Sequence, residues 1–238
     1  MTLSFQNEIL LNYTESGGSP TPPPTPTYTY NVEAVGDNVV FDGKYGKILN
    51  IIDGHSRTSY IKTKTAIADE LTQADSWKIS LTYQELGYGM ENYLTVLSTG
   101  APSIDTNDYQ IFASGFEAGS LNLFMSTGSG WDLAQFVSAP SSLYATSPSW
   151  FVYELEFTGT QYVWRMKNLT TGDTTFTTCW SANSTSKVAK TTATSTPYYL
   201  ILGNQQFGYP NYGNFIEIDL SESYYTIDGT TTYLAIAQ

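Results

Sequence analysis

The sequence contains a single cysteine, Cys179, and a single histidine, His55. One cysteine excludes an internal disulfide, and its place beside Trp180 in a strand-like run predicts a small buried apolar residue. We therefore expect the chain to be made in a reducing cytosol. One histidine without a cysteine pair supplies no zinc ligand set, and the chain has no Gly-x-Ser-x-Gly elbow. We interpret His55 as a solvated turn residue.

Basic residues are also few: 10 Lys and Arg stand against 22 Asp and Glu, for a formal net charge of -12. None of them cluster, so the basic stripe that a nucleic-acid groove requires is missing. An anionic membrane surface is disfavoured for the same reason. No apolar run is long enough to span a membrane, and the N-terminus lacks the basic region of a secretory signal. We therefore expect neither nucleic acid nor membrane as a partner.

Aromatic residues are plentiful at 15%, and charged residues make up only 13% of the chain. Such a composition favours strands with polar, uncharged outer faces. Short alternating segments recur roughly every ten residues between Gly, Asn, Asp and Pro, which predicts an all-β sandwich or barrel. The expected strands are 28–33, 38–42, 47–52, 59–63, 77–84, 93–98, 109–114, 120–126, 150–158, 161–168, 173–180, 198–202, 215–220, 224–227 and 232–237. The one helix candidate is 65–74, where Ile67, Leu71 and Ala74 share a face.

The N-terminal part differs from the rest because it is rich in proline at Pro20, Pro22, Pro23, Pro24 and Pro26. Proline fixes φ and removes a backbone donor, so this stretch is either an extended polyproline spacer or a disordered linker. Both interpretations give three parts: an anchoring segment 1–16, a linker 17–27 and a β domain 28–238.

The anchoring segment carries apolar residues in a strand-like pattern, which are Leu3, Phe5, Ile9 and Leu11. A strand this short does not fold alone. We expect it to add to the sheet edge of a partner protein, or to a trimeric collar, by β-augmentation.

Several motifs follow one another in an order typical of a known fold. They are Ser76–Tyr83, Tyr93–Gly100, Leu121–Met125 with Trp131, Trp150–Phe157 with Tyr162–Trp164, and Tyr198–Gly203 with Phe215–Leu220. Their order resembles the concanavalin A-like lectin/glucanase sandwich, especially its laminin-G-like, phage and bacterial display versions. The resemblance implies an antiparallel β-sandwich of jelly-roll type. The closing piece, 218–229, is similar to the ends of bacteriophage tail and fibre modules.

The run Glu217–Glu222 resembles the Glu-x-Asp-x-x-Glu signature of β-glucanases with this fold, in which the outer glutamates are nucleophile and acid/base. In a regular strand Glu217 and Asp219 share a face and Glu222 points to the other one. Only a bulge near Ser221 would bring Glu222 round. The motif also lies near the end of the chain, whereas in those enzymes it lies mid-domain. We therefore expect no catalytic residue and interpret the run as a strand with a polar outer side.

Glycan binding is predicted from loops that mix rings, which stack on sugars, with amides, which pair with hydroxyls. The richest loop is 203–214, where we expect Tyr209, Tyr212 and Asn211 to form part of a shallow sugar-binding face, together with Trp131. A second loop of this kind is 85–92.

No metal ligand set is assigned, although the run Asp105–Asp108 offers oxygens of the kind that lectin loops of this fold give to Ca2+. We prefer to interpret this run as a turn initiator, and we expect no cofactor, with Ca2+ left open.

Together these features predict a phage virion structural or display protein, either a fibre, a tail protein or a capsid decoration. We expect it at the virion surface after synthesis in the host cytoplasm, attached to other virion proteins through residues 1–16. We also expect a homo-oligomer, with a trimer favoured, that adheres weakly to a neutral cell-surface glycan. Two alternatives stay open. One is a β-glucanase-like glycoside hydrolase, and the other is a bacterial carbohydrate-binding surface module, which would need a signal sequence.

Overall fold

The fold is seen in a computed structural model that describes residues 26–48, 59–67, 74–85, 92–98, 110–117, 120–125, 137–138, 140, 149–183, 199–205 and 216–238. The predicted anchoring segment and the linker up to residue 25 lie outside these ranges.

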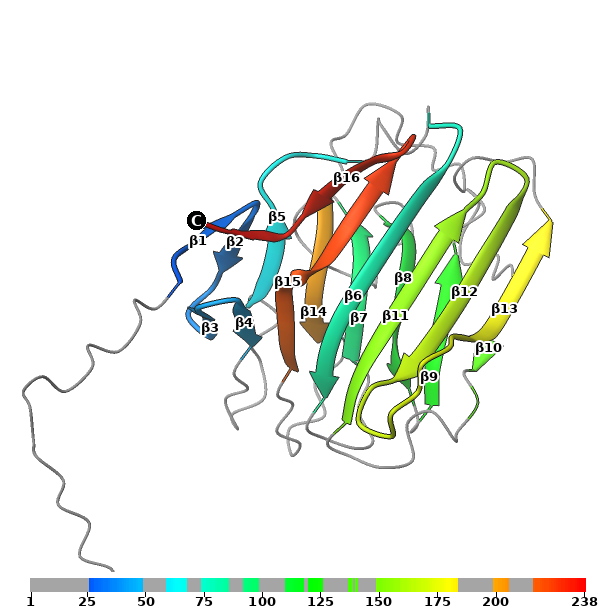
Figure 1. The fold of residues 1–238 in the computed structure, drawn as a ribbon, viewed down its shortest axis with the longest axis horizontal. Helices are drawn as coiled ribbons and strands as arrows, with labels where there is room; N and C mark the ends of the chain where they lie inside the picture. Colours follow the sequence, from blue (N-terminus) through cyan, green and yellow to red (C-terminus); the bar gives the residue numbers. More distant parts are fainter. Residues whose placement is uncertain are drawn as a thin grey trace, which may run out of the picture.

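Two antiparallel sheets lie face to face, which confirms the predicted β-sandwich (Figure 1). Seven strands of the eight-stranded sheet follow the order β13-β12-β11-β6-β15-β4-β3. The eighth strand, β16, also pairs with β15. Its strands are β3 (Val39–Asp42), β4 (Tyr45–Ile48), β6 (Trp77–Glu85), β11 (Ser149–Phe157), β12 (Gln161–Asn168), β13 (Thr177–Asn183), β15 (Ile216–Ile227) and β16 (Thr230–Tyr233).

The seven-stranded sheet packs behind it with the order β10-β9-β8-β7-β14-β5-β2. Its strands are β2 (Val32–Val35), β5 (Tyr60–Thr63), β7 (Asn92–Ser98), β8 (Gln110–Glu117), β9 (Ser120–Met125), β10 (Val137–Ser138) and β14 (Tyr199–Gln205). A separate pair joins β1 (Tyr28–Tyr30) to β17 (Ala235–Ala237), so the first and last described strands lie side by side.

Two expected strands are each broken at the same place in the fold. The segment 28–33 divides into β1 and β2 at Asn31, and the segment 232–237 divides into β16 and β17 at Leu234. The Asn31 backbone N–H donates to the Leu234 carbonyl, and the Asn31 side chain donates to the Tyr233 carbonyl. Both chains therefore turn there from the β1–β17 pair into a main sheet, a change that alternation alone does not reveal.

The helix expected over 65–74 is not found at either end of that range. Residues 65–67 and Ala74 have no helical structure, and residues 68–73 lie outside the described part of the chain. Ile67 and Ala74 are nevertheless buried in the core. Two of the three residues that predicted the helix therefore face the core, whereas Leu71 lies outside the described residues.

The core fills the space between the sheets and is built from the inward positions of the central strands. The alternation predicted for β6 is confirmed, because Trp77, Ile79, Leu81 and Tyr83 are all buried. Each lies opposite an equally buried residue of β11: Phe157, Leu155, Tyr153 and Phe151 respectively. Burial of this large apolar area is the main favourable term in folding.

Cys179 is half-buried on β13 and packs against the core, so the prediction of a buried residue is confirmed only in part. It lies on the outermost strand of its sheet, where one side is less covered. Burial still raises the pKa of its thiol to about 12. The described residues include no helix long and apolar enough to cross a membrane.

Candidate functional site on the outer face of the eight-stranded sheet

The strand β15 carries a bulge in the middle of the acidic motif Glu217–Glu222. This bulge decides whether Glu222 lies on the same face of the sheet as Glu217 and Asp219. Its pairing with β6 shifts between Asp219, opposite Thr82, and Tyr224, opposite Ser80. Before the bulge Ile216, Ile218 and Leu220 are buried, and after it Ser223 and Tyr225 are. The inward positions therefore change from even to odd numbers, and the exposed Glu222 lies on the outer face with Glu217 and Asp219. The strand is not regular here, and the bulge near Ser221 that the sequence analysis gave as the condition for this arrangement is present.

The Asp219 carboxylate holds the bulge in shape. Its Oδ1 accepts hydrogen bonds from the Ser221 N–H (3.1 Å), the Ser221 hydroxyl (2.7 Å) and the Glu222 N–H (3.2 Å). Its Oδ2 lies 2.6 Å from the Lys44 ammonium, and the Asp219 side chain is only 7% exposed. Backbone donors that the bulge leaves without a ladder partner are thereby satisfied, so Asp219 is tied up in structural contacts.

The other side of the bulge is closed by Ser223, which is fully buried. Its hydroxyl accepts the Thr82 N–H at 3.0 Å, and its carbonyl accepts the Leu234 N–H at 2.8 Å. Leu220, just before it, donates its N–H to the Lys44 carbonyl at 2.8 Å. β15 therefore pairs with β4 before the bulge and with β16 after it.

The acidic half of β15 is neutralised and covered. Glu217 lies 3.9 Å from the Lys47 ammonium and its side chain is 17% exposed. The ring centroids of Tyr45 on β4 and Trp150 on β11 lie 5.9 Å apart on the same face of the sheet as Glu217 and Asp219. Those strands are three inter-strand spacings apart, about 14 Å, so the two rings lean toward each other over β15 and β6.

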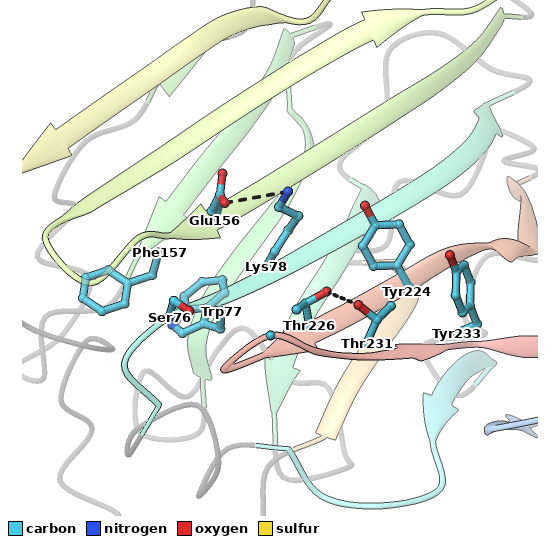
Figure 2. Close-up of a pocket in the computed structure, with 10 residues that line it drawn as sticks. Ser76, Trp77, Lys78, Glu156, Phe157, Tyr224, Thr226, Thr231 and Tyr233 are labelled. Atoms are coloured by element: carbon cyan, nitrogen blue, oxygen red, sulfur yellow. Dashed lines mark hydrogen bonds and ion pairs between the residues drawn. The ribbon is translucent and has the colours of Figure 1, made fainter.

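A shallow pocket of about 380 Å³ opens beside the second half of β15. Tyr224 and Tyr233 lie opposite each other on β15 and β16, with ring centroids 5.4 Å apart. Figure 2 shows them standing side by side on the same surface as Lys78 and Glu156. The Tyr233 side chain is 44% exposed, which makes it one of the few large apolar groups in the described residues that face solvent.

Polar groups surround the two rings. The Thr226 and Thr231 hydroxyls are 3.0 Å apart, and the Lys78 ammonium lies 3.7 Å from a Glu156 oxygen (Figure 2). Glu156 is also bound by the Arg165 guanidinium, whose Nε reaches Glu154 at 2.6 Å. The pocket therefore offers two rings, two hydroxyls, an ammonium and a carboxylate within one surface.

The turn between β15 and β16 fixes the position of the pocket wall. Asp228 and Gly229 both have positive φ, 45° and 80°, as a two-residue hairpin turn requires. The Asp228 carboxylate accepts the backbone N–H groups of Asp75 (2.7 Å) and Ser76 (2.9 Å), and its own N–H donates to the Ser76 carbonyl. The hairpin that carries Tyr233 is thus fastened to the start of β6.

Sequence reasoning missed this pocket. The glycan-binding residues predicted from the loops are Tyr209, Tyr212, Asn211 and Trp131, and all lie outside the described residues, as do His55 and the run Asp105–Asp108. The signal for part of the pocket was present, because a two-residue Asp228-Gly229 turn fixes a register in which Tyr224 faces Tyr233. Within the ranges that the structure describes, no group of three or more acidic, histidine or cysteine residues is arranged to hold a metal ion.

Comparisons with known proteins show the fold. No family model and no curated protein matches the sequence. A legume lectin-like domain from Entamoeba histolytica is similar in structure, with a TM-score of 0.53 at 12% identity over 82% of this chain and 89% of that one.

Two further solved structures are also similar to this chain in structure. A family 7 alginate lyase, solved in complex with substrate, has a TM-score of 0.52 at 9% identity over 83% of this chain and 84% of its own. The exoplasmic/lumenal domain of VIP36, solved in a form bound to Ca2+ and Man3GlcNAc, has a TM-score of 0.50 at 8% identity over 83% of this chain and 85% of its own. This chain has the sandwich fold of the concanavalin A-like lectins and glucanases.

Proposed function

We propose that the protein binds carbohydrate, without cleaving it, in the pocket formed by Tyr224, Tyr233, Lys78 and Glu156. The observation that carries the proposal is the tyrosine pair, of which Tyr233 is exposed and Tyr224 half-buried, set among hydroxyl, ammonium and carboxylate groups. Aromatic rings stack on the apolar faces of sugars, while a few placed polar groups fix the orientation of the hydroxyls. An ammonium donates to a sugar hydroxyl and a carboxylate accepts from one, so the Lys78–Glu156 pair can engage adjacent hydroxyls.

Charge favours a neutral sugar. The ammonium in this pocket already has a carboxylate partner, and the chain as a whole carries a net charge of -12. An acidic polymer would be repelled over the range of a Debye length. Shallow sites of this kind bind weakly, so useful adhesion would come from several copies acting together.

Binding to an array of neutral and acidic glycans tests the proposal, with the full chain as the probe. Tyr233→Ala is expected to weaken binding about tenfold or more, the effect of removing an exposed aromatic anchor, while Tyr233→Phe should retain most of it. The matched control is Leu169→Ala, which removes another exposed apolar side chain from a different place. If Tyr233→Ala binds like the unaltered chain, the pocket is not the site.

The finer part of the proposal is that this face is displayed on a phage virion. Its support comes from the sequence alone: the resemblance of 218–229 to tail and fibre modules, and a proline-rich stretch that sets residues 1–16 apart. The same pocket would serve a bacterial surface module equally well. Electron microscopy of virions labelled with antibody to this protein separates the two. Label on host cells but not on virions would remove the display role and leave carbohydrate binding intact.

A second candidate function, glycoside hydrolysis, is favoured by one observation: the bulge places Glu222 on the same face as Glu217 and Asp219. Two carboxylates on one face are what such chemistry requires. Against it, Asp219 and Glu217 lie beside Lys44 and Lys47 and under two aromatic rings. Assays of β-glucan cleavage decide the matter. We expect no cleavage, and an activity that falls by two or more orders of magnitude in Glu217→Gln or Glu222→Gln would establish the enzyme instead.

A further inference from the structure

Among the described residues, the outer face of the eight-stranded sheet carries two aromatic pairs, and one of them belongs to the pocket. The first pair is Tyr224 and Tyr233, and the second is Tyr45 and Trp150. Both residues of the second pair are half-buried, so part of each is accessible from solvent.

The register places the second pair close to the first. Tyr224 lies opposite Ser80 of β6, and Asp219, which pairs with Tyr45, lies opposite Thr82. Trp150 lies opposite Gln84, two residues further along β6. From Ser80 to Gln84 the strand advances about 13 Å. The two pairs are therefore too far apart for one sugar ring and close enough for one short chain of sugars.

Nothing bulky on β6 separates them. The outward side chains of the strand between the two pairs belong to Ser80 and Thr82, both short and buried beneath their neighbours. These two side chains therefore do not protrude between the pairs, and Glu222 is exposed at the bulge as a hydrogen-bond acceptor for a ligand that crosses from one pair to the other.

Apart from the exposed Glu222, the charged groups named along this path are paired within the protein. Lys44 binds Asp219, Lys78 binds Glu156, and Arg165 binds Glu154 and Glu156. An anionic chain would have to displace these carboxylates to reach the cations, whereas an uncharged chain needs only rings and hydrogen-bonding groups.

We propose that the outer sheet face binds a linear, uncharged polysaccharide across both aromatic pairs, with Tyr45 and Trp150 as a second platform that engages only chains longer than the pocket can hold. This inference rests on the proposed function, because it extends the same site. It assigns the ligand to chain-like polymers rather than to a single terminal sugar.

Titration calorimetry of the full chain with two series of probes tests the proposal: β-1,3-linked and β-1,4-linked glucose oligosaccharides of increasing length, from the disaccharide to the hexasaccharide. The hexasaccharide of at least one series is expected to bind about tenfold or more tightly than its disaccharide, as expected when a second aromatic contact is added. Trp150→Ala should remove this gain and leave disaccharide binding within about twofold of the unaltered chain. Tyr233→Ala should weaken every length.

Tyr45→Ala is a second variant with the same expected result, and it keeps the test decisive if Trp150→Ala fails to fold. Ile236→Ala removes an exposed apolar side chain from the separate β1–β17 pair and should leave the length dependence unchanged. Equal binding of disaccharide and hexasaccharide, or an unchanged gain in the variant that folds, would overturn the second platform and leave the pocket standing. If neither series binds but the array retains another sugar, the linear-chain inference is likewise overturned. Failure of every glycan to bind overturns the proposed function as well.

Discussion

The two halves of β15 have the same backbone direction and the same inner neighbour, β6, but opposite chemistry on the outer face. The half before the bulge presents Glu217 and Asp219, both beside lysines and under the rings of Tyr45 and Trp150. The half after it presents Tyr224 and Thr226, which line an open pocket. The acidic half looks like an active site in sequence but is closed in structure. The tyrosine half carries no signature motif yet offers the accessible surface.

The difference follows from the strand on the other side. Before the bulge β15 pairs with β4, whose Lys47 and neighbouring Lys44 supply the cations. After it β15 pairs with β16, which supplies Tyr233 and Thr231. Whether a row of carboxylates on a strand forms an accessible site therefore depends on the side chains that the neighbouring strand supplies.

The largest expected effect concerns Asp219. Asp219→Ala removes three hydrogen bonds that hold the bulge and leaves Lys44 without its partner, at an expected cost of about 2–3 kcal/mol. The value lies below that for a fully buried pair because the Lys44 side chain is 37% exposed and can be hydrated. Urea unfolding measures it. Asp219→Asn keeps a carbonyl oxygen for the bulge and should cost about half as much.

The matched control is Glu33→Ala, which removes the carboxylate of a more exposed pair, 2.7 Å from Lys62. Its expected cost is about 0–1 kcal/mol. If Asp219→Ala is no more destabilising than Glu33→Ala, then Asp219 does not hold the bulge, and the contrast between the two halves of β15 loses its structural cause.

A smaller effect is expected at alkaline pH. The hydrogen bond that the Lys44 ammonium donates to Asp219 raises the pKa of Lys44 above its ordinary value of 10.5, against an opposing contribution from burial. The charged lysine is therefore favoured by folding, so this stability is fully present below the unfolded pKa and is lost as pH rises through the folded pKa. Lys44→Gln should flatten the decline in stability above pH 10.5.

The measurement is the free energy of unfolding by denaturant, below and above that pH. The control is a double variant that carries both Asp219→Asn and Lys44→Gln. The double variant should show the same alkaline profile as Asp219→Asn alone, because each change removes the same interaction. A further flattening in the double variant would show that Lys44 acts through another carboxylate.

Much of the sandwich could be predicted from the sequence because apolar residues recur at every second position in several of its central strands. Trp77–Gln84 and Gln161–Asn168 were recognisable from period-two patterns that the structure reproduces. From the sequence, the bulge could only be stated as the condition under which Glu222 would join the other two carboxylates. Its presence depends on contacts of Lys44 and Ser223 with residues far away in the sequence, and no local pattern encodes such contacts. The Asp228-Gly229 turn predicts that Tyr224 faces Tyr233. Lys78 and Glu156 join them through strand pairing across long sequence separations, which alternation does not specify.

The β1–β17 pair has a mechanical consequence. Tyr28 lies opposite Ala237 and Tyr30 opposite Ala235, and the Gln238 N–H donates to the Thr27 carbonyl at 2.9 Å. Residues 27 and 238 therefore leave this ribbon at the same end. A force that pulls them apart acts on the ladder one bond at a time, as in opening a zipper, instead of shearing all its bonds together. Under tension between these two points, β1 and β17 should separate first and at low force, and the two main sheets would bear load only after this short ribbon had opened.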